Sequence, residues 1–296
     1  MKVLITGASG LIGSALAARL VGGGHHVVRL TRAEQPGPDE FHWDPAAGEI
    51  DSGALDGVDA IVHLAGETVT GQWTDAKKQR IRDSRVLGTR LLAQAAAEGD
   101  PRPRAFVSAS AIGLYGDRGD DPVAEGSPMG DGFLAGVVRD WEAAAEPARE
   151  AGIRVVNLRF GIVQSAAGGA LRAQLPLFRL GLGGRVGNGR QYVSWVAIDD
   201  VAGAIEFALG NERLSGPANV SAPQPVTNAE YARTLGRVLR RPAVLPAPAP
   251  VLRLVLGEFS GELLGGQRVR PDRLLAEGFE FQYPELESAL RHVLGR

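Results

Sequence analysis

The first twenty residues, MKVLITGASGLIGSALAARL (residues 1–20), decide the fold of this chain. Residues 3–5 are a short apolar run of the kind found in buried strands, and the run ends before Gly7. Gly10 and Gly13 follow at a spacing of three, and an alanine- and leucine-rich helical pattern starts at Leu11. A strand, a glycine-rich turn and a helix in this order are the context that the dinucleotide-binding fingerprint requires.

Each glycine of this turn has a physical reason to be there. Gly7 permits the tight turn, Gly10 lets the backbone approach a pyrophosphate, and Gly13 lets the helix pack closely on the strand. The free N–H groups and the dipole at the start of the helix favour an anion. We therefore expect a bound dinucleotide, with a ligand-free strand-to-helix turn as the alternative. The turn residues expected to bind it are Gly7, Ser9, Gly10, Leu11, Ile12 and Gly13.

The N-terminal half alternates between strand and helix patterns. Strands are predicted at residues 2–6, 25–30, 40–44, 60–64, 105–108 and 154–158, and helices at 11–21, 75–98 and 136–146, the last ended by Pro147. Continuous apolar strands such as AIVHLAG (60–66) fit burial on both faces. The sequence thus predicts an α/β fold with a Rossmann-like, doubly wound parallel sheet.

The pattern loosens after about residue 165, where Gly-, Leu- and Arg-rich and proline-rich stretches begin. We expect a dinucleotide-binding Rossmann domain at 1–165 and a mainly substrate-binding, smaller C-terminal lobe at 166–296. A strand and helix at 192–210 are expected to return to the sheet. Asp199 and Asp200 stand near the start of that helix, where acids suit capping and the helix dipole.

Composition narrows the classes of function. The 296 residues carry a formal net charge of −2 and no cysteine, which gives no electrostatic footprint for nucleic acid or an anionic membrane and excludes thiolate chemistry. The five histidines show no metal-ligand spacing, and His63 is expected to be a hydrogen-bonded core residue of its strand. No apolar run reaches the length of a membrane span or continues as a secretion signal. We therefore expect a cytoplasmic protein without a metal site.

The end of the second strand indicates which dinucleotide is bound. An NAD site usually has an acid there, bonded to the ribose hydroxyls. This chain has Thr31 and Arg32, with Glu34 only later. A hydroxyl and a guanidinium suit a 2′-phosphate, so NADP(H) is favoured over NAD(H). Arg29 is held in reserve, because strand alternation points it to the opposite face from Arg32.

Longer motifs resemble a known group of proteins. TGASGLIG, VHLAG, VSASAIGLYG and WVAIDDVAGAI resemble the extended short-chain dehydrogenases/reductases. Six further motifs resemble one subfamily, the epimerase family proteins, which are sugar-nucleotide epimerase-like and carry a C-terminal domain of unknown function. These motifs are FHWDP, LAGE, RIRDSRVLGTRLL, RDWEAA, FRLGLGG and GQRVRPDRLLAEGFEFQYPELESAL. The resemblance covers essentially the whole chain.

The resemblance implies further contacts with the cofactor. Leu64, Ala65 and Gly66 would form the backbone that passes the pyrophosphate and ribose, and Val163 would lie near the nicotinamide. Arg85 would face the cofactor from a helix. Its alternative, from the residues alone, is one of several spaced arginines on a solvated helix face.

The catalytic residues of the superfamily are a Ser or Thr, a Tyr, and a Lys four residues after the Tyr. The lysine lowers the pKa of the tyrosine, which moves the substrate proton. Setting Glu142 against the acid usual in this helix puts Leu134 in the tyrosine position and Val138 in the lysine position. A shift by one residue gives Phe133 and Val137, and neither pair can move a proton. The chain therefore departs from the superfamily's Tyr–Lys dyad.

Three residues remain as candidate catalytic groups: Ser110, Tyr115 and Glu67. Ser110, preferred to Ser108, follows the fifth strand, where the resemblance places the serine. Tyr115 comes in the next loop, with a structural turn as its alternative. Glu67 follows the cofactor strand and could act as a base. An exposed acid, or a partner of Arg85, is its alternative.

Arg185 and Arg190 lie where sugar-nucleotide enzymes supply basic groups for the substrate diphosphate, or else on a solvated loop. We expect an NADP(H)-binding oxidoreductase or epimerase-like protein that acts on an unidentified small molecule, with a sugar nucleotide as one candidate. The alternative is a non-catalytic NADPH-binding sensor or scaffold. The expected state is a monomer or homodimer.

Overall fold

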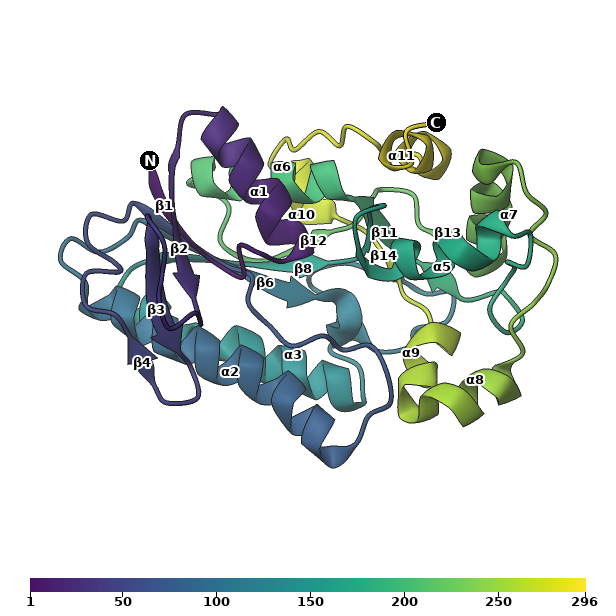
Figure 1. The fold of residues 1–296 in the computed structure, drawn as a ribbon, viewed down its shortest axis with the longest axis horizontal. Coiled ribbons are helices and arrows are strands. Elements are labelled where there is room, and N and C mark those ends of the chain that lie inside the picture. The colour runs from purple at the N-terminus through teal and green to yellow at the C-terminus, as the bar shows by residue number, and fades with distance from the viewer.

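The computed structural model describes residues 1–296 and is built on an eight-stranded sheet (Figure 1). The sheet order is β12 (Gly216–Val220), β8 (Arg154–Phe160), β6 (Ala105–Ala111), β5 (Ala60–His63), β1 (Lys2–Thr6), β2 (His26–Thr31), β3 (Glu40–Asp44) and β4 (Glu49–Ile50). All neighbours pair in parallel except β3 and β4. The strand order reverses at β1, since β2 lies on one side of it and β5 on the other. Ligands of such sheets bind at the carboxyl ends of the strands at this point.

Helices cover both faces of the sheet, as the sequence predicts (Figure 1). One face carries α1 (Leu11–Gly22), α6 (Ile198–Gly210) and α10 (Asp272–Ala276), and the other α2 (Asp75–Glu98), α3 (Phe133–Ala143) and α4 (Glu146–Glu150). The two faces form separate apolar cores, of 26 and 15 buried residues. The doubly wound α/β prediction is confirmed.

The helix predicted at residues 136–146 has different bounds in the structure. It begins at Phe133, after Gly132 turns the chain with φ of 102°, and ends at Ala143. Pro147 does not end a helix but lies in the first turn of α4. Proline is tolerated there because the first-turn N–H groups have no partner within the helix.

The C-terminal half returns to the sheet more than the sequence suggests. β12 forms the sheet edge beside β8, and Leu274 and Phe279 pack into the same core as α1. A third core is formed mainly by α5 (Gly169–Arg179), α7 (Asn228–Leu239) and α11 (Leu286–Val293). The other elements are η1 (Ile112–Tyr115), η2 (Gly257–Phe259), α8 (Ala249–Leu256), α9 (Ser260–Leu264) and the strand pairs β9 (Ile162–Gln164) with β11 (Trp195–Ala197), β10 (Tyr192–Val193) with β13 (Val226–Thr227), and β7 (Pro122–Val123) with β14 (Arg268–Val269). No helix has both the length and the apolar character needed to cross a bilayer.

The two acids in the first turn of α6 tie down the end of the chain. The buried Asp200 carboxylate accepts hydrogen bonds from the backbone N–H groups of Gln282 (2.6 Å) and Tyr283 (3.1 Å), and burial raises its pKa. Asp199 lies 3.0 Å from the His292 ring. Neither side chain caps the helix, so the first-turn position is as predicted but the contacts are tertiary.

Candidate functional site

The glycine turn joins β1 to α1 in a shape that side chains would block. Gly7 has φ of 66°, and a Cβ there would lie 2.9 Å from the backbone of Leu64 and Ala65. A Cβ at Gly13 would lie 2.2 Å from the Gly7 carbonyl oxygen, which fits the predicted close packing of helix on strand. A Cβ at Gly10 would meet only that oxygen, at 3.2 Å. No side chain caps the start of α1, and the capping residue Gly10 borders an open space.

That open space is a cavity of about 1020 Å³ at the carboxyl ends of β1, β2 and β5. The turn residues Gly7, Ser9 and Gly10 form one wall, and Leu64, Ala65 and Gly66 form another. These predicted cofactor residues are thus brought together from two separate parts of the chain. A cleft at the strand-order reversal, with an open helix N-terminus, fits a dinucleotide pyrophosphate.

Three guanidinium groups line the cavity, together with the carboxyl groups of Glu40, Asp44, Glu67 and Asp83. Thr31 and Arg32 line it as predicted, and the guanidinium-bearing Arg29 and Arg80 line it as well. Arg29 was expected to point away, but the cavity extends past the end of the sheet and reaches both sides of β2. The Thr31 hydroxyl accepts a hydrogen bond from the Ala33 N–H at 3.1 Å, which fixes the turn that presents Arg32.

Buried polar groups behind the β5 segment fix its backbone. The Thr6 hydroxyl accepts hydrogen bonds from the N–H groups of Leu64 and Ala65, both at 3.1 Å, and lies 2.8 Å from His63 Nδ1. His63 is fully buried, and burial, with a smaller effect of the Arg85 charge, lowers its pKa from 6.5 to about 3. His63 is therefore a neutral core residue, as expected, although its Nε2 has no hydrogen-bond partner.

Arg85, on α2, supports the backbone that follows β5. Its guanidinium donates to the carbonyl oxygens of Glu67 and Ile81, both at 3.0 Å, and stacks 5.0 Å from the Trp141 ring. A Cβ at Gly66 would lie 3.4 Å from its Cζ. Burial lowers the pKa of Arg85 to about 10. Arg85 thus shapes the cavity wall through backbone, and its direct contact with a cofactor stays a prediction.

Glu67 is the one candidate catalytic group that lines the cavity. Its carboxylate accepts a hydrogen bond from Lys77 Nζ at 2.5 Å, and its N–H donates to the Ser84 hydroxyl at 3.0 Å. The bond to Lys77 lowers the pKa of Glu67, helped by the charges of Arg80 and Arg32. Glu67 is therefore an ionised but weakened base at neutral pH.

Ser110 and Tyr115 belong to a buried polar network on the far side of β6. The Ser110 hydroxyl donates to the Glu142 carboxylate at 2.6 Å, and Arg159 grips that carboxylate with two bonds of 2.8 Å. The Tyr115 hydroxyl donates to Asn219 Oδ1 at 2.7 Å and accepts from Arg159 at 3.0 Å. Burial raises the pKa of Tyr115. Both candidates are interior groups, since Ser110 is 2% exposed and Tyr115 0%.

The positions of the superfamily dyad are apolar in the structure too. Leu134 and Val138 lie on α3, and Val138 is buried. Glu142, one turn further along, was used in the sequence only to set the alignment, and its role as the centre of the network was missed. No local pattern marks this role, because the partners of Glu142 are Ser110 and Arg159, which come from two other parts of the chain.

The remaining predicted contacts lie in the C-terminal half. Val163 is half-buried on β9, which pairs with β11. Arg185 and Arg190 are exposed in the loop after α5 and form no ion pair. The structure does not bring these two arginines into the large cavity.

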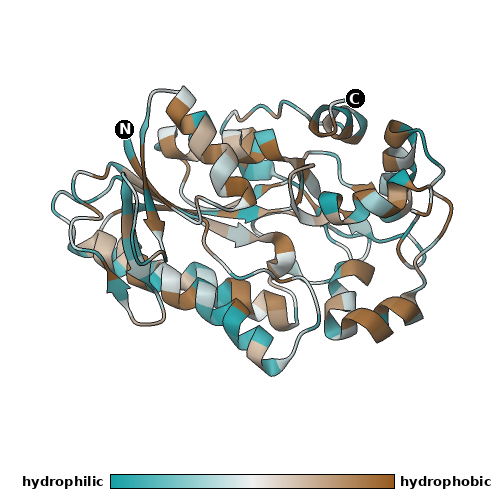
Figure 2. Ribbon diagram, viewed as in Figure 1, coloured by the Kyte–Doolittle hydropathy of each residue, from teal (hydrophilic) through white to brown (hydrophobic).

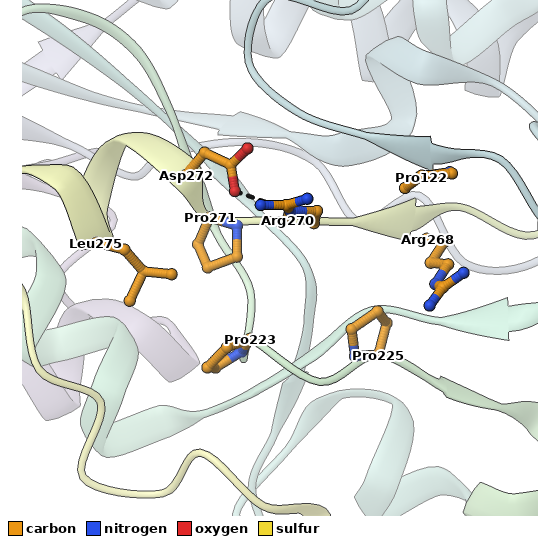
Figure 3. Close-up of a pocket in the computed structure, with 8 residues that line it drawn as sticks. All are labelled: Pro122, Pro223, Pro225, Arg268, Arg270, Pro271, Asp272 and Leu275. Atoms are coloured by element: carbon orange, nitrogen blue, oxygen red, sulfur yellow. Dashed lines mark hydrogen bonds and ion pairs between the residues drawn. The ribbon is translucent and has the colours of Figure 1, made fainter.

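A second, smaller cavity of about 350 Å³ lies elsewhere, between the β7–β14 pair and the loop after β12 (Figure 3). Prolines line much of it, and Arg270 is held by Asp272 at 3.0 Å. It shares no residue with the large cavity. The large cavity is therefore the candidate cofactor site.

Comparison with known proteins agrees with this geometry. The NAD dependent epimerase/dehydratase family matches residues 3–221, and a domain of unknown function (DUF1731) matches 247–293. An epimerase family protein of Mycobacterium tuberculosis is 45% identical over 99% of this chain and 98% of its own, and human epimerase family protein SDR39U1 is 38% identical over 99% and 100%.

Solved structures are similar as well. The crystal structure of human SDR39U1 (isoform 2) with NADPH has a TM-score of 0.93 at 37% identity, covering 100% of this chain and 99% of that one. The nucleoside-diphosphate sugar epimerase of Corynebacterium glutamicum has a TM-score of 0.83 at 40% identity, covering 100% and 58%. With the family match spanning most of the chain, this protein belongs to the NAD dependent epimerase/dehydratase family.

Proposed function

We propose that this protein is an NADP(H)-dependent oxidoreductase or epimerase-like enzyme that acts on a small molecule without a Tyr–Lys dyad. The observation that carries the proposal is the single cavity that joins the glycine turn to three guanidinium groups. A nicotinamide cofactor supplies hydride transfer when it is bound.

The residues around the cavity fit NADP(H) rather than NAD(H). The open start of α1 and the side-chain-free position 10 suit the pyrophosphate. Arg32, with Arg29 and Arg80 nearby, suits the 2′-phosphate, and Thr31 stands where NAD enzymes carry an acid. The similar human protein was crystallised with NADPH, which supports this choice.

A sugar nucleotide is the substrate class that we propose first. The similar Corynebacterium protein is described as a nucleoside-diphosphate sugar epimerase. Arg185 and Arg190 are exposed and free of ion pairs, so their guanidinium groups can receive a diphosphate.

For proton transfer we propose Glu67 as the first group to test, with Ser110 second and Tyr115 third. Glu67 lines the cavity, and Lys77 Nζ donates a hydrogen bond to its carboxylate at an N–O distance of 2.5 Å. Ser110 points its proton at Glu142, so it can orient a substrate oxygen only if that bond is shared or broken. Tyr115 is bound on both sides by Asn219 and Arg159.

A second candidate function is a cofactor-binding sensor or scaffold without turnover. It is favoured by one observation: each of the three candidate groups already holds a charged or polar partner inside the protein. Such partners must be exchanged before the group can act on a substrate.

The deciding experiment follows deuterium from NADPH labelled at either face of C4 into a panel of carbonyl compounds and 4-keto sugar nucleotides, whose carbonyl carbon accepts the hydride. Transfer from one face, lost in Gly10→Val and in Glu67→Gln, supports the enzyme with Glu67 in its site. NADPH binding without transfer to any compound supports the sensor. Transfer that survives Glu67→Gln, Ser110→Ala and Tyr115→Phe at full rate refutes the proposed catalytic groups.

A further inference from the structure

Exposed apolar side chains gather at one end of the molecule. Two chain segments carry them, and these lie side by side, because Leu245 donates its N–H to the Gly183 carbonyl (3.2 Å) and Ala247 to that of Arg185 (2.8 Å). We call the following exposed residues the apolar end: Leu177, Leu180, Leu182, Val244, Leu245, Val251, Leu254 and Val255. Figure 2 shows the hydrophobic colour over α8 and the connector that leads into it, at the end of the molecule opposite β4.

The helix α8 presents an outward apolar stripe. Val251, Leu254 and Val255 follow the spacing i, i+3 and i+4, so they share one helix face. Their exposed fractions are 52%, 84% and 56%, and no residue of α8 is buried. The inner face carries the half-buried Leu252 and Leu256, and Gln72 donates to the Val255 backbone carbonyl near the end of the helix at 3.0 Å. The outward stripe therefore has no partner within the chain.

The two chain segments that carry the apolar end are rich in arginine and contain no acid, although Asp199, Glu230 and Glu258 directly adjoin them. Residues 165–198 and 231–257 contain nine arginines and not one Asp or Glu, in a chain whose net charge is −2. Of the nine, only Arg237 forms an ion pair, with Glu287. Arg185 and Arg190 are kept for the substrate diphosphate proposed above. The remaining six are exposed and have no carboxylate partner: Arg172, Arg179, Arg233, Arg240, Arg241 and Arg253. These two segments are thus far more basic than the net charge of −2 indicates.

We propose that the apolar end docks on the surface of an anionic phospholipid bilayer. The leucines and valines would enter the boundary between headgroups and acyl chains, and the arginines would contact lipid phosphates. Long arginine side chains can reach the headgroups while their stems lie against apolar surface. The expectation of no membrane partner rested on the net charge and on the lack of a long apolar run, and neither detects charged and apolar residues gathered at one end of the molecule.

The charge pattern favours lipid over an acidic protein partner. The α8 stripe offers no hydrogen-bonding side chain that would recognise one particular partner. The six unpaired guanidinium groups are spread over two segments and line neither cavity, which fits a fluid layer of phosphates better than one folded partner. The contact is peripheral, in keeping with the absence of a membrane-crossing helix.

Vesicle sedimentation tests the proposal with the full chain. We expect binding to vesicles of 70% phosphatidylcholine and 30% phosphatidylglycerol, little binding to pure phosphatidylcholine, and release by 0.5 M NaCl. Arg179→Gln/Arg253→Gln should weaken binding roughly 10–30-fold, because each cation near such a surface contributes about fivefold. Leu254→Gln should weaken it about tenfold.

Matched variants far from the apolar end are the controls. Val21→Gln replaces an exposed apolar residue of α1, and Arg90→Gln/Arg104→Gln removes two exposed arginines elsewhere. These should bind vesicles like the unaltered protein. Equal losses in controls and test variants, or equal binding to neutral vesicles, would overturn the proposal. So would a dimer in gel filtration that Leu254→Gln dissociates, because a second copy would then cover this surface.

Discussion

Replacing Gly10 and Gly13 by alanine, one at a time, should separate cofactor binding from folding. At Gly13 the new methyl would lie 2.2 Å from the Gly7 carbonyl oxygen and 2.7 Å from the Ala8 Cα, both backbone atoms. Overpacking of this kind costs about 1–3 kcal/mol. For 296 residues, with an unfolding entropy of about 2.1 cal/mol/K per residue, this corresponds to a fall in Tm of about 2–5 °C.

At Gly10 the result should be the reverse. Its backbone has φ of −75°, which alanine adopts freely, and the methyl meets only the Gly7 oxygen, at 3.2 Å. The Tm should therefore stay within about 2 °C, since alanine at a compatible glycine position changes stability by about 1 kcal/mol or less. The methyl enters the cavity wall, and losing one charged hydrogen bond to the pyrophosphate would weaken NADPH about 10–150-fold.

Two measurements on each variant check the predicted Tm and the predicted NADPH affinity: thermal unfolding without cofactor, and calorimetric titration with NADPH. The reasoning is refuted if Gly10→Ala binds NADPH as tightly as the unaltered protein, since the pyrophosphate would then lie elsewhere. It is equally refuted if Gly13→Ala keeps its Tm, since the close helix-on-strand contact would then be unimportant.

Three further predictions concern charge and burial. Arg32→Ala should weaken NADPH by about 10–150-fold, the loss of one charge-assisted phosphate contact, and leave NADH unchanged in calorimetry; equal NADPH affinity would contradict the assignment. The folded pKa of His63 lies at about 3, below the unfolded value of 6.5, so the unfolded state takes up the proton first and stability falls as pH drops from 6.5 towards 3. Urea unfolding at pH 7 and pH 5 should show a loss larger by about 2 kcal/mol in the unaltered protein than in His63→Gln; parallel losses would argue against it. Tyr115→Phe should lower the unfolding free energy by about 1–3 kcal/mol, because Asn219 and Arg159 each lose a buried partner; an unchanged urea midpoint would show that water replaces the hydroxyl.

The fold was predictable because short stretches of sequence indicate most of its strands and helices. The strand at residues 2–6 and the helix at 75–98 have their predicted bounds, and the parallel order follows from strand and helix alternation. The strand at Gly216–Val220 was missed because GPANV begins with a glycine and a proline, which weaken a strand pattern. Proline is tolerated at this position because β12 forms the edge of the sheet.

The cofactor side of the site was predictable for a related reason. Gly7 and Gly13 have roles set by backbone geometry, and the glycine spacing of three is the sequence pattern that indicates this geometry. The positions of Arg29 and Arg80 at the cavity could not be predicted, because they depend on how the sheet ends and how α2 crosses it. The pairing of Glu67 with Lys77 joins residues ten apart across a loop, and no periodic pattern encodes it.

The catalytic side shows how one local change in sequence can alter a whole network. Val138 and Glu142 are four residues apart, so they share a face of α3. A lysine at position 138 would lie beside the Glu142 carboxylate, but here valine leaves that carboxylate to Arg159 and Ser110. Breaking a buried ion pair by removing one partner costs about 3–5 kcal/mol. Ser110, Glu142 and Arg159 are thus held together by the fold itself. Of the three candidate catalytic groups only Glu67 lines the cavity, so the proposed proton transfer is to be tested there before Ser110 and Tyr115.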